Sequence, residues 1–199
     1  MTTHIEILVF NGVDELDALA PYRVLHGAIR FGAEFTVKLV TLEPVETVTA
    51  SAGLVFTPDG VLGEPDILVV PGGGWATRDP IGAWGEAQRG VIPAAIGSQA
   101  ARGATIATVC TGGMLAAYAD LVTGRNVVTH HAALDDLRAR GANVIQARVV
   151  DDGDLISAGG VTSGLDLALY LVERFASAEI AAKVGGMLEY ERRGTVWRR

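Results

Sequence analysis

The chain has 199 residues, of which 49% are hydrophobic and 25 are glycine, and its formal net charge is −7. This length fits a single domain over residues 1–199, and the apolar, glycine-rich composition is typical of α/β proteins with tight turns between buried elements. The acidic balance excludes an extended nucleic-acid surface, which requires a basic face. Residues 191–199 are locally basic and are expected to form a solvated end.

No segment indicates secretion or insertion into a membrane. The first ten residues lack a basic stretch followed by a long apolar run, and no segment approaches about 18 uninterrupted apolar residues. A single cysteine excludes an internal disulfide and fits a reducing compartment. No four-ligand metal spacing is present, and the adjacent His130 and His131 would point to opposite faces of a strand. We therefore expect a cytoplasmic protein with no metal, no cofactor, and no nucleic-acid or membrane partner.

Apolar runs and turn residues predict strands that alternate with helices along the chain. Strands are predicted at residues 5–10, 35–42, 66–70, 105–109, 126–130, 143–150 and 155–158. Helices are predicted at residues 22–31 with Pro21 in the first turn, 86–102 with a late start or a break, 114–119 closed by Gly124, 133–140, 165–175 and 177–188. Residues 45–57 and 151–154 indicate a short hairpin and a hairpin turn. This alternation predicts an α/β fold with a mainly parallel sheet and helices on both faces.

Cys110 stands at an abrupt change from strand to helix. The residues before it are β-branched, and the residues after it open a helix through Thr111, Gly112 and Gly113. Such a turn holds one side chain above the sheet edge, as in a nucleophile elbow. A free cysteine is more often a small core residue, but the N-terminus of a helix favours a thiolate. We therefore expect Cys110 to be reactive, with a lowered pKa.

Three unusual segments follow predicted strands, at residues 11–17, 71–74 and 110–113. Sites in open α/β sheets form beyond the carboxyl ends of the strands, so these segments are expected to converge. Glycines such as Gly73 and Gly74 allow backbone N–H groups to face a ligand, although a plain flexible turn would have the same composition. The run at residues 159–164 lacks a nucleotide-binding pattern and is interpreted as a close-packing turn behind the cysteine.

Five sequence features together resemble the ThiJ/PfpI superfamily, which is related to glutamine amidotransferase domains. They are Asp17 with Pro21 after the first strand, Pro71-Gly72-Gly73, Val109-Cys110-Thr111-Gly112, Thr129-His130, and the run at residues 159–166. The resemblance implies a flavodoxin-like fold and a homodimer. The most similar subgroup comprises the isonitrile (isocyanide) hydratases and the ligand domains of some AraC-type regulators.

The sequence also departs from parts of this superfamily. Thr111 stands where PfpI-type proteases have a histidine after the cysteine, which counts against peptidase activity. Asp17 replaces the glutamate of the Parkinson-linked oxidative-stress members. The regulators carry a helix-turn-helix region after this domain, whereas this sequence ends at Arg199, so direct transcriptional control is not expected. Trp75 is expected either to shape a substrate pocket or to lie in the core.

The resemblance implies a cysteine-dependent hydro-lyase that acts on a small molecule. Cys110 would attack an isonitrile carbon to give a thioimidate, and Asp17 would deliver the proton and then assist water in releasing a formamide. Backbone N–H groups at Gly73, Gly74 and Thr111 would stabilise developing charge or bind substrate. Asp17 could instead be a helix cap, although Asp14 suits that role better, and His130 either approaches the cysteine or is structural. The alternative functions are a cofactor-independent glyoxalase and a non-enzymatic cysteine sensor.

Overall fold

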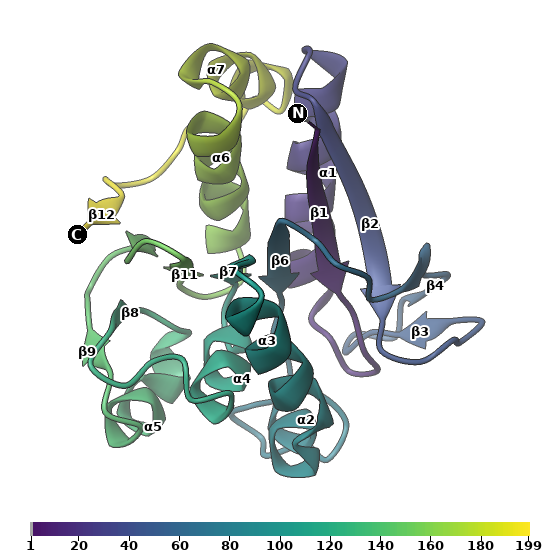
Figure 1. Ribbon diagram of the computed structural model, residues 1–199, viewed down its shortest axis with the longest axis vertical. Coiled ribbons are helices and arrows are strands. Elements are labelled where there is room, and N and C mark those ends of the chain that lie inside the picture. Colours follow the sequence, from purple (N-terminus) through teal and green to yellow (C-terminus); the bar gives the residue numbers. More distant parts are fainter. Residues whose placement is uncertain (1) are drawn as a thin grey trace.

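Within residues 2–199, the part of the chain that the computed structural model describes, eight strands form a central sheet. Their order across the sheet is β12-β10-β11-β7-β6-β1-β2-β5 (Figure 1). The strands are β1 (Thr3–Leu8), β2 (Phe35–Thr41), β5 (Gly60–Val61), β6 (Ile67–Val70), β7 (Thr105–Thr108), β10 (Val149–Asp151), β11 (Leu155–Ala158) and β12 (Trp197–Arg198). Neighbouring strands run parallel except at β10, which is antiparallel to β11. The prediction of a mainly parallel α/β sheet is confirmed.

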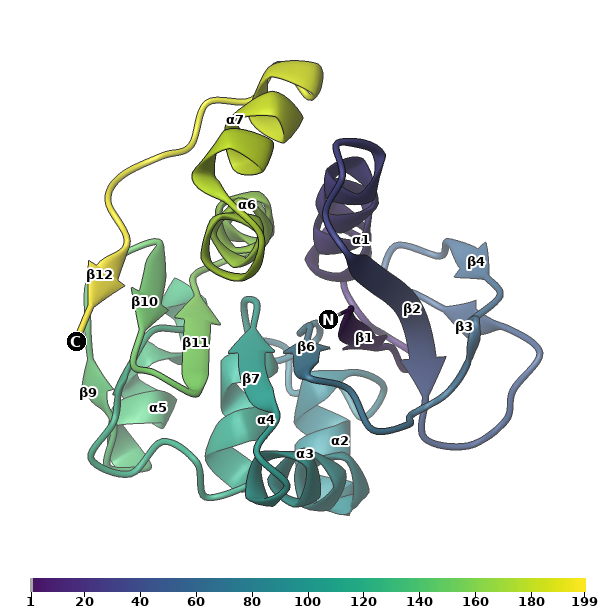
Figure 2. The same cartoon turned by 45° about the horizontal axis from the view of Figure 1, so that its top comes forward.

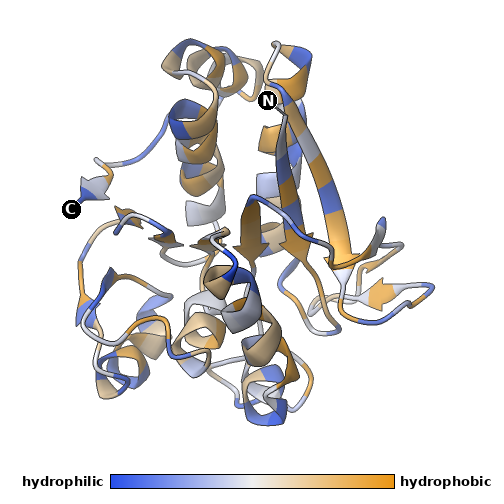
Figure 3. Cartoon of the chain, in the orientation of Figure 1, coloured by the Kyte–Doolittle hydropathy of each residue, from blue (hydrophilic) through white to orange (hydrophobic). Residues whose placement is uncertain are grey.

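Helices cover both faces of this sheet (Figure 2). One face carries α1 (Glu15–Arg30), α6 (Ser163–Phe175) and α7 (Ala178–Met187). The other carries α2 (Ala83–Arg89), α3 (Val91–Ala101), α4 (Gly112–Tyr118) and α5 (Leu134–Ala139). Every residue of the inner strand β6 is buried, which explains its uninterrupted apolar sequence, and Figure 3 shows it in the hydrophobic colours.

Helix α1 begins earlier than the predicted start at Tyr22. Asp14 caps it, because the Asp14 side chain accepts hydrogen bonds from the N–H groups of Leu16 and Asp17. Pro21 therefore lies inside the helix, where its ring leaves the carbonyl of Asp17 without the usual helical donor. Pro21 faces α6, since a Cβ built on Gly164 would lie 3.4 Å from the proline Cδ. This close packing between α1 and α6 keeps Pro21 inside the helix, although the local preference of proline is for a position nearer the helix start.

The segment after α4 differs most from the prediction. Helix α4 ends at Tyr118 with Ala119 as its C-cap, so Gly124 does not close it. The predicted strand at 126–130 is reduced to β8 (Asn126–Val127), and the one at 143–150 is interrupted between β9 (Asn143–Val144) and the start of β10. Strands β8 and β9 pair in a small separate sheet. The hairpin of β3 (Val48–Thr49) and β4 (Val55–Phe56) is confirmed, as is the β10–β11 hairpin.

The basic C-terminal segment is not a free solvated end. Trp197 and Arg198 form β12 against β10, at the edge of the central sheet. Arg192 and Arg198 both form ion pairs with Glu173 of α6. Most residues of this segment are exposed, as expected for a solvated end, but the ion pairs with Glu173 and the pairing with β10 hold it to the fold.

Gly112 provides a direct test of the packing between α4 and the sheet. A Cβ at this position would lie 2.0 Å from the carbonyl oxygen of Val70. We expect Gly112→Ala to lower the free energy of unfolding by about 1–3 kcal/mol or more, as overpacking does. The measurement is urea denaturation.

Gly97→Ala is the matched control, because a Cβ there meets no atom closer than 3.8 Å. Gly97 lies inside α3, so alanine should leave stability unchanged or raise it by up to about 1 kcal/mol. Equal stability of the Gly112 and Gly97 variants would contradict the packing argument.

Candidate active site

Cys110 occupies a sharp turn between β7 and α4. Its φ angle is +55°, a left-handed conformation that side chains other than glycine rarely adopt. The turn is fixed by the Cys110 N–H, which donates to the carbonyl oxygens of Ala158 (3.2 Å) and Gly159 (2.9 Å). The predicted strand–cysteine–helix turn is therefore present, and residues 158–159 pack behind it as expected.

The glycine loop after β6 lies directly against this turn. A Cβ on Gly72 would lie 2.3 Å from Thr111 Oγ1 and 2.6 Å from Thr111 N, so only glycine fits. The Gly72 N–H donates to Asp17 Oδ2 at 3.0 Å, and the Gly72 carbonyl accepts from the Asp14 N–H at 2.8 Å. The three predicted segments therefore do converge at the carboxyl end of the sheet.

Asp17 is completely buried in the first turn of α1. Its Oδ1 is also buried and has no hydrogen bond of regular geometry among the described residues. The Cys110 thiol is close enough to interact with this carboxyl group. Since Asp14 caps the helix, Asp17 has no capping role. The Asp17 carboxyl group and the Cys110 thiol thus lie side by side in one buried site.

Both groups of this pair hold their protons more strongly than usual. Burial, followed by the nearby charge of Asp14, raises the pKa of Asp17 to about 7. Burial, followed by the charge of Asp17, raises the pKa of Cys110 to about 12. The N–H groups of Val161 and Thr111 act in the opposite direction and favour the thiolate, but their effect is smaller. The expectation of an acidic thiol is therefore wrong, because desolvation and a like charge outweigh the local donors.

The predicted backbone donors divide into two groups. Thr111 directs its N–H toward the sulfur of Cys110. The N–H of Gly73 donates to Thr111 Oγ1 at 3.0 Å, so it is already occupied and does not provide the expected free donor. Gly74 faces residues 79–82 and lines a separate cavity of about 550 Å³ with Asn11, Ser51 and other residues. Loop packing thus removes Gly73 from the expected role, while Gly74 lies beside the site.

His130 lies at the rim of the site without a hydrogen bond to Cys110 among the described contacts. Its Nδ1 accepts from the Ala132 N–H at 3.2 Å, and its ring packs against Gly160. Burial, with a contribution from His131, lowers the pKa of His130, so the ring is neutral near pH 7. The two histidine rings lie 4.1 Å apart rather than on opposite faces, because the chain turns into a 3-10 helix at His131.

Trp75 is buried and anchors the glycine loop. Its Nε1 donates to Asp136 Oδ2 at 2.6 Å, and its ring packs edge-on against Tyr118. Of the two expectations for Trp75, the core position is therefore correct and the pocket wall is not. The indole connects the loop that carries Gly72 and Gly73 to α5.

Val161 is the site residue that the sequence does not reveal. Its φ angle is +37°, and its N–H interacts with the Cys110 sulfur. A β-branched residue gives no sequence signal for a left-handed conformation. The only available signal was the glycine-rich run around it.

Over residues 2–199, no cluster of three or more His, Cys, Asp or Glu side chains is arranged to hold a metal ion. No helix in this part of the chain combines the length and hydrophobicity needed to cross a bilayer.

Comparison of the chain with known proteins assigns it to a family. The model of the DJ-1/PfpI family matches residues 3–174. The chain is 34% identical to the isonitrile hydratase of Pseudomonas putida over 193 residues, which cover 96% of this chain and 79% of that protein. The chain belongs to the DJ-1/PfpI family.

Other DJ-1/PfpI relatives support the same fold. The chain is 28% identical to the Parkinson disease protein 7 homolog of Danio rerio, over 89% of this chain and 92% of that protein. A crystal structure of a ThiJ/PfpI family protein from Pseudomonas syringae superposes with a TM-score of 0.85 and 27% identity, and covers 98% of this chain and 77% of that one. The flavodoxin-like fold and the resemblance to the ThiJ/PfpI superfamily are thus confirmed.

The raised pKa of the thiol predicts slow alkylation. We expect wild-type Cys110 to react with iodoacetamide at pH 7.5 more slowly than a free thiol, because the thiolate is the reactive form. Asp17→Asn removes the neighbouring negative charge, so the pKa of Cys110 should fall and labelling at this pH should accelerate.

The measurement is the labelling rate by mass spectrometry as a function of pH, with folding of both proteins checked by circular dichroism. A labelling profile that does not change with Asp17→Asn would show that the carboxylate does not control the thiol.

Proposed function

We propose that this chain is a cysteine-dependent hydro-lyase that adds water to an isonitrile and releases an N-substituted formamide. The observation that carries the proposal is the buried pair of Asp17 and Cys110, in which a proton-holding carboxyl group faces a nucleophilic atom. The 34% identity to an isonitrile hydratase over nearly the whole chain supports the choice of substrate. An isonitrile carbon takes up a nucleophile and a proton at one atom, which suits a thiol beside a carboxylate.

In the first half of the reaction, the sulfur of Cys110 bonds to the isonitrile carbon. The Asp17 carboxylate takes the thiol proton as the sulfur attacks and then gives it to the same carbon. The product is a thioimidate, in which the carbon carries sulfur, hydrogen and a double bond to nitrogen. A pKa of about 7 allows Asp17 both to accept and to release the proton near neutral pH.

In the second half, water adds to the thioimidate carbon. Asp17 takes a proton from the water and delivers it to the nitrogen, which leaves a carbon bonded to hydroxyl, sulfur and nitrogen. The carbon–sulfur bond then breaks, the hydroxyl becomes the carbonyl of the formamide, and its proton returns through Asp17 to the sulfur. The N–H groups of Val161 and Thr111 stabilise the departing thiolate.

The same geometry disfavours a peroxide sensor. Oxidation of cysteine is favoured by exposure and by thiolate character, whereas Cys110 is 5% exposed and its pKa is raised. The low exposure and raised pKa of Cys110 are no obstacle to the hydration reaction, because Asp17 removes the thiol proton as the sulfur attacks. A reducing cytoplasm suits this buried free thiol, and we place the enzyme there.

Turnover of an isonitrile by the pair variants tests the proposal. Asp17→Asn keeps the shape but removes the transferable proton, so formamide production should fall roughly 10²–10⁴-fold, as for a lost general acid–base group. Cys110→Ala should abolish it. Formamide release is followed by liquid chromatography.

Asp135→Asn is the matched control, since it makes the same change from carboxylate to amide on an exposed side chain that pairs with Arg138 and takes no part in the buried pair. Its turnover should stay within a few-fold of wild type. Lactate formation from methylglyoxal, without formamide from any isonitrile, would replace the proposal by the glyoxalase alternative.

We also propose that the chain forms a homodimer through the face that carries the start of α1 and the β3–β4 hairpin. Leu16, Leu54 and Val55 are 44–55% exposed there, and exposed apolar side chains gathered in one patch mark association surfaces. Glu15 ties the hairpin to α1 by accepting hydrogen bonds from Ser51 and Ala52. The exposed apolar residues are thus held on a rigid frame that a second copy can cover.

Sedimentation at micromolar concentration measures the oligomeric state. Wild type should sediment as a dimer, and Val55→Glu should shift it toward the 20.8 kDa monomer by placing a charge in the interface. Val91→Glu, at a 60% exposed position on α3, is the control and should not change the mass. A monomeric wild-type protein would refute the proposed dimer.

A further inference from the structure

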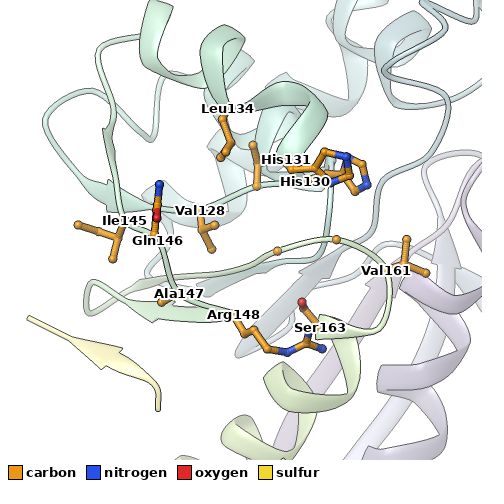
Figure 4. Close-up of a pocket in the computed structure, with 13 residues that line it drawn as sticks. Val128, His130, His131, Leu134, Ile145, Gln146, Ala147, Arg148, Val161 and Ser163 are labelled. Atoms are coloured by element: carbon orange, nitrogen blue, oxygen red, sulfur yellow. The ribbon is translucent and has the colours of Figure 1, made fainter. Parts of the chain in front are cut away.

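Thr129 is a buried threonine beside the cysteine turn, and it has no role in the hydration steps described so far. It lies between Val128 and His130, on a segment that borders a cavity of about 550 Å³ beside α5 (Figure 4). Thr129 is 2% exposed, and its Oγ1 donates a hydrogen bond to the carbonyl oxygen of Cys110 at 2.6 Å. A hydroxyl group from a distant segment thus holds the backbone of the nucleophilic residue.

The hydrogen bond from Thr129 fixes a peptide unit that also faces the sulfur. The Cys110 carbonyl and the Thr111 N–H belong to one planar trans peptide, so they point in opposite directions and rotate together. The carbonyl accepts the Thr129 hydroxyl, and the N–H is directed toward the Cys110 sulfur. Holding the carbonyl therefore keeps the N–H directed at the sulfur.

This peptide unit needs support from outside the turn. The φ angle of Cys110 is +55°, which is unfavourable for a residue with a Cβ. The carbonyls of residues 158 and 159 accept the Cys110 N–H and so fix the peptide before the cysteine. After the cysteine, the Gly113 N–H also donates to the Cys110 carbonyl, but at 3.3 Å. The 2.6 Å hydrogen bond from Thr129 is the shorter of the two and is the stronger restraint on this peptide.

Two contacts hold Thr129 itself in place. The Val128 N–H donates to Ser157 Oγ of β11 at 2.9 Å, and both residues are buried. Gly113, in the first turn of α4, leaves room for the threonine, since a Cβ there would lie 3.1 Å from Thr129 Oγ1 and 3.2 Å from Thr129 Cβ. The segment that carries the hydroxyl is therefore anchored to the sheet and packed against α4.

We propose that Thr129 is a positioning residue of the hydration reaction. Its hydroxyl fixes the peptide between Cys110 and Thr111, so that the Thr111 N–H stays directed at the sulfur while the thiolate forms and departs. Thr129 donates to the carbonyl and acts on the sulfur through this peptide. The proposal rests on the proposed function for the reaction that Thr129 serves, whereas the hydrogen bonds around the sulfur do not depend on the substrate.

The labelling rate of Cys110 separates this role from a structural one. Thr129→Val keeps the shape of the side chain and removes the hydroxyl, so the Thr111 N–H loses its alignment and the thiolate loses stabilisation. Labelling by iodoacetamide at a fixed pH should slow at least about threefold, since a hydrogen bond to a charged atom is worth more than a factor of ten and part of it is lost. A threonine that only supports packing would have the opposite effect, because loosening the turn exposes the thiol and accelerates labelling.

The ionisable groups around the sulfur stay the same in this comparison. Asp17 of α1 faces the thiol, Asp14 acts on Asp17, and the His130 ring packs against Gly160. None of these side chains is changed by Thr129→Val. A slower rate at the same pH therefore reports the loss of the hydroxyl.

Thr108→Val is the matched control. Thr108 is also completely buried, two residues before Cys110, but its Oγ1 has no hydrogen-bond partner among the described residues. The same loss of a hydroxyl there should leave labelling and turnover within about twofold of wild type. Thr129→Ser retains the donor and should restore both rates to within about twofold of wild type.

Turnover of an isonitrile provides the second measurement. Thr129→Val should lower kcat by about 10- to 100-fold, because a small displacement at the reacting atoms costs up to about 100-fold. KM should stay within about threefold of wild type, since the displaced donor acts in the steps at the sulfur and not in substrate binding.

Unchanged or faster labelling of Thr129→Val overturns the proposal, as does a slower rate that Thr129→Ser does not restore. A raised KM with unchanged kcat also overturns it. Circular dichroism and thermal unfolding establish that each variant is folded, and Thr129→Ala, which removes the same donor, replaces a valine variant that does not fold. Absence of formamide from the wild-type protein defeats the proposed function alone, because the labelling rates still decide whether Thr129 positions the Thr111 N–H.

Discussion

The backbone of Gly72 is the contact on which the site depends. Its N–H holds the Asp17 carboxylate, its carbonyl accepts from the Asp14 N–H, and its missing side chain lets Thr111 approach. One residue thus joins the start of α1, the end of β6 and the cysteine turn. A side chain here would separate all three, because the nearest atom would lie 2.3 Å from its Cβ.

This close packing also controls protonation. Excluding water from Asp17 and Cys110 disfavours charge on either group. The charge of Asp17 raises the pKa of Cys110 further, whereas the hydrogen bond with the thiol acts to lower the pKa of Asp17. The result is a carboxyl group that exchanges its proton near neutral pH beside a thiol that keeps its own. Such a pair is suited to moving one proton between sulfur, carbon and water, and is poorly suited to spontaneous oxidation.

The reactive pair and the cavity beside α5 occupy neighbouring but different parts of the molecule. The reactive pair is supplied by the first turn of α1 and the turn after β7, whereas the adjacent cavity is built mainly from the irregular region after α4 and the start of α6. Residues 159–161 separate the two and contact both.

The sequence alone determined the alternation of elements, the hairpins and the turn at Cys110, because each depends on residues that are neighbours in the chain. A β-branched run followed by Thr-Gly-Gly specifies a strand, a turn and a helix locally. Asp14 was likewise identifiable as a cap. The early start of α1, with Pro21 inside the helix, could not be identified from the sequence, since packing against Gly164 of α6 overrides the local preference of proline.

Only the tertiary structure decided how strongly the Cys110 thiol holds its proton and which backbone N–H groups are already hydrogen-bonded. The local pattern predicted an acidic thiol, but burial and Asp17, which lies far away in the sequence, raise the pKa of Cys110 to about 12. The Gly73 N–H was expected to face a ligand, yet Thr111 Oγ1 accepts it. Both outcomes have one physical reason: solvent exclusion and hydrogen-bond partners depend on contacts between distant segments, which local sequence patterns do not encode.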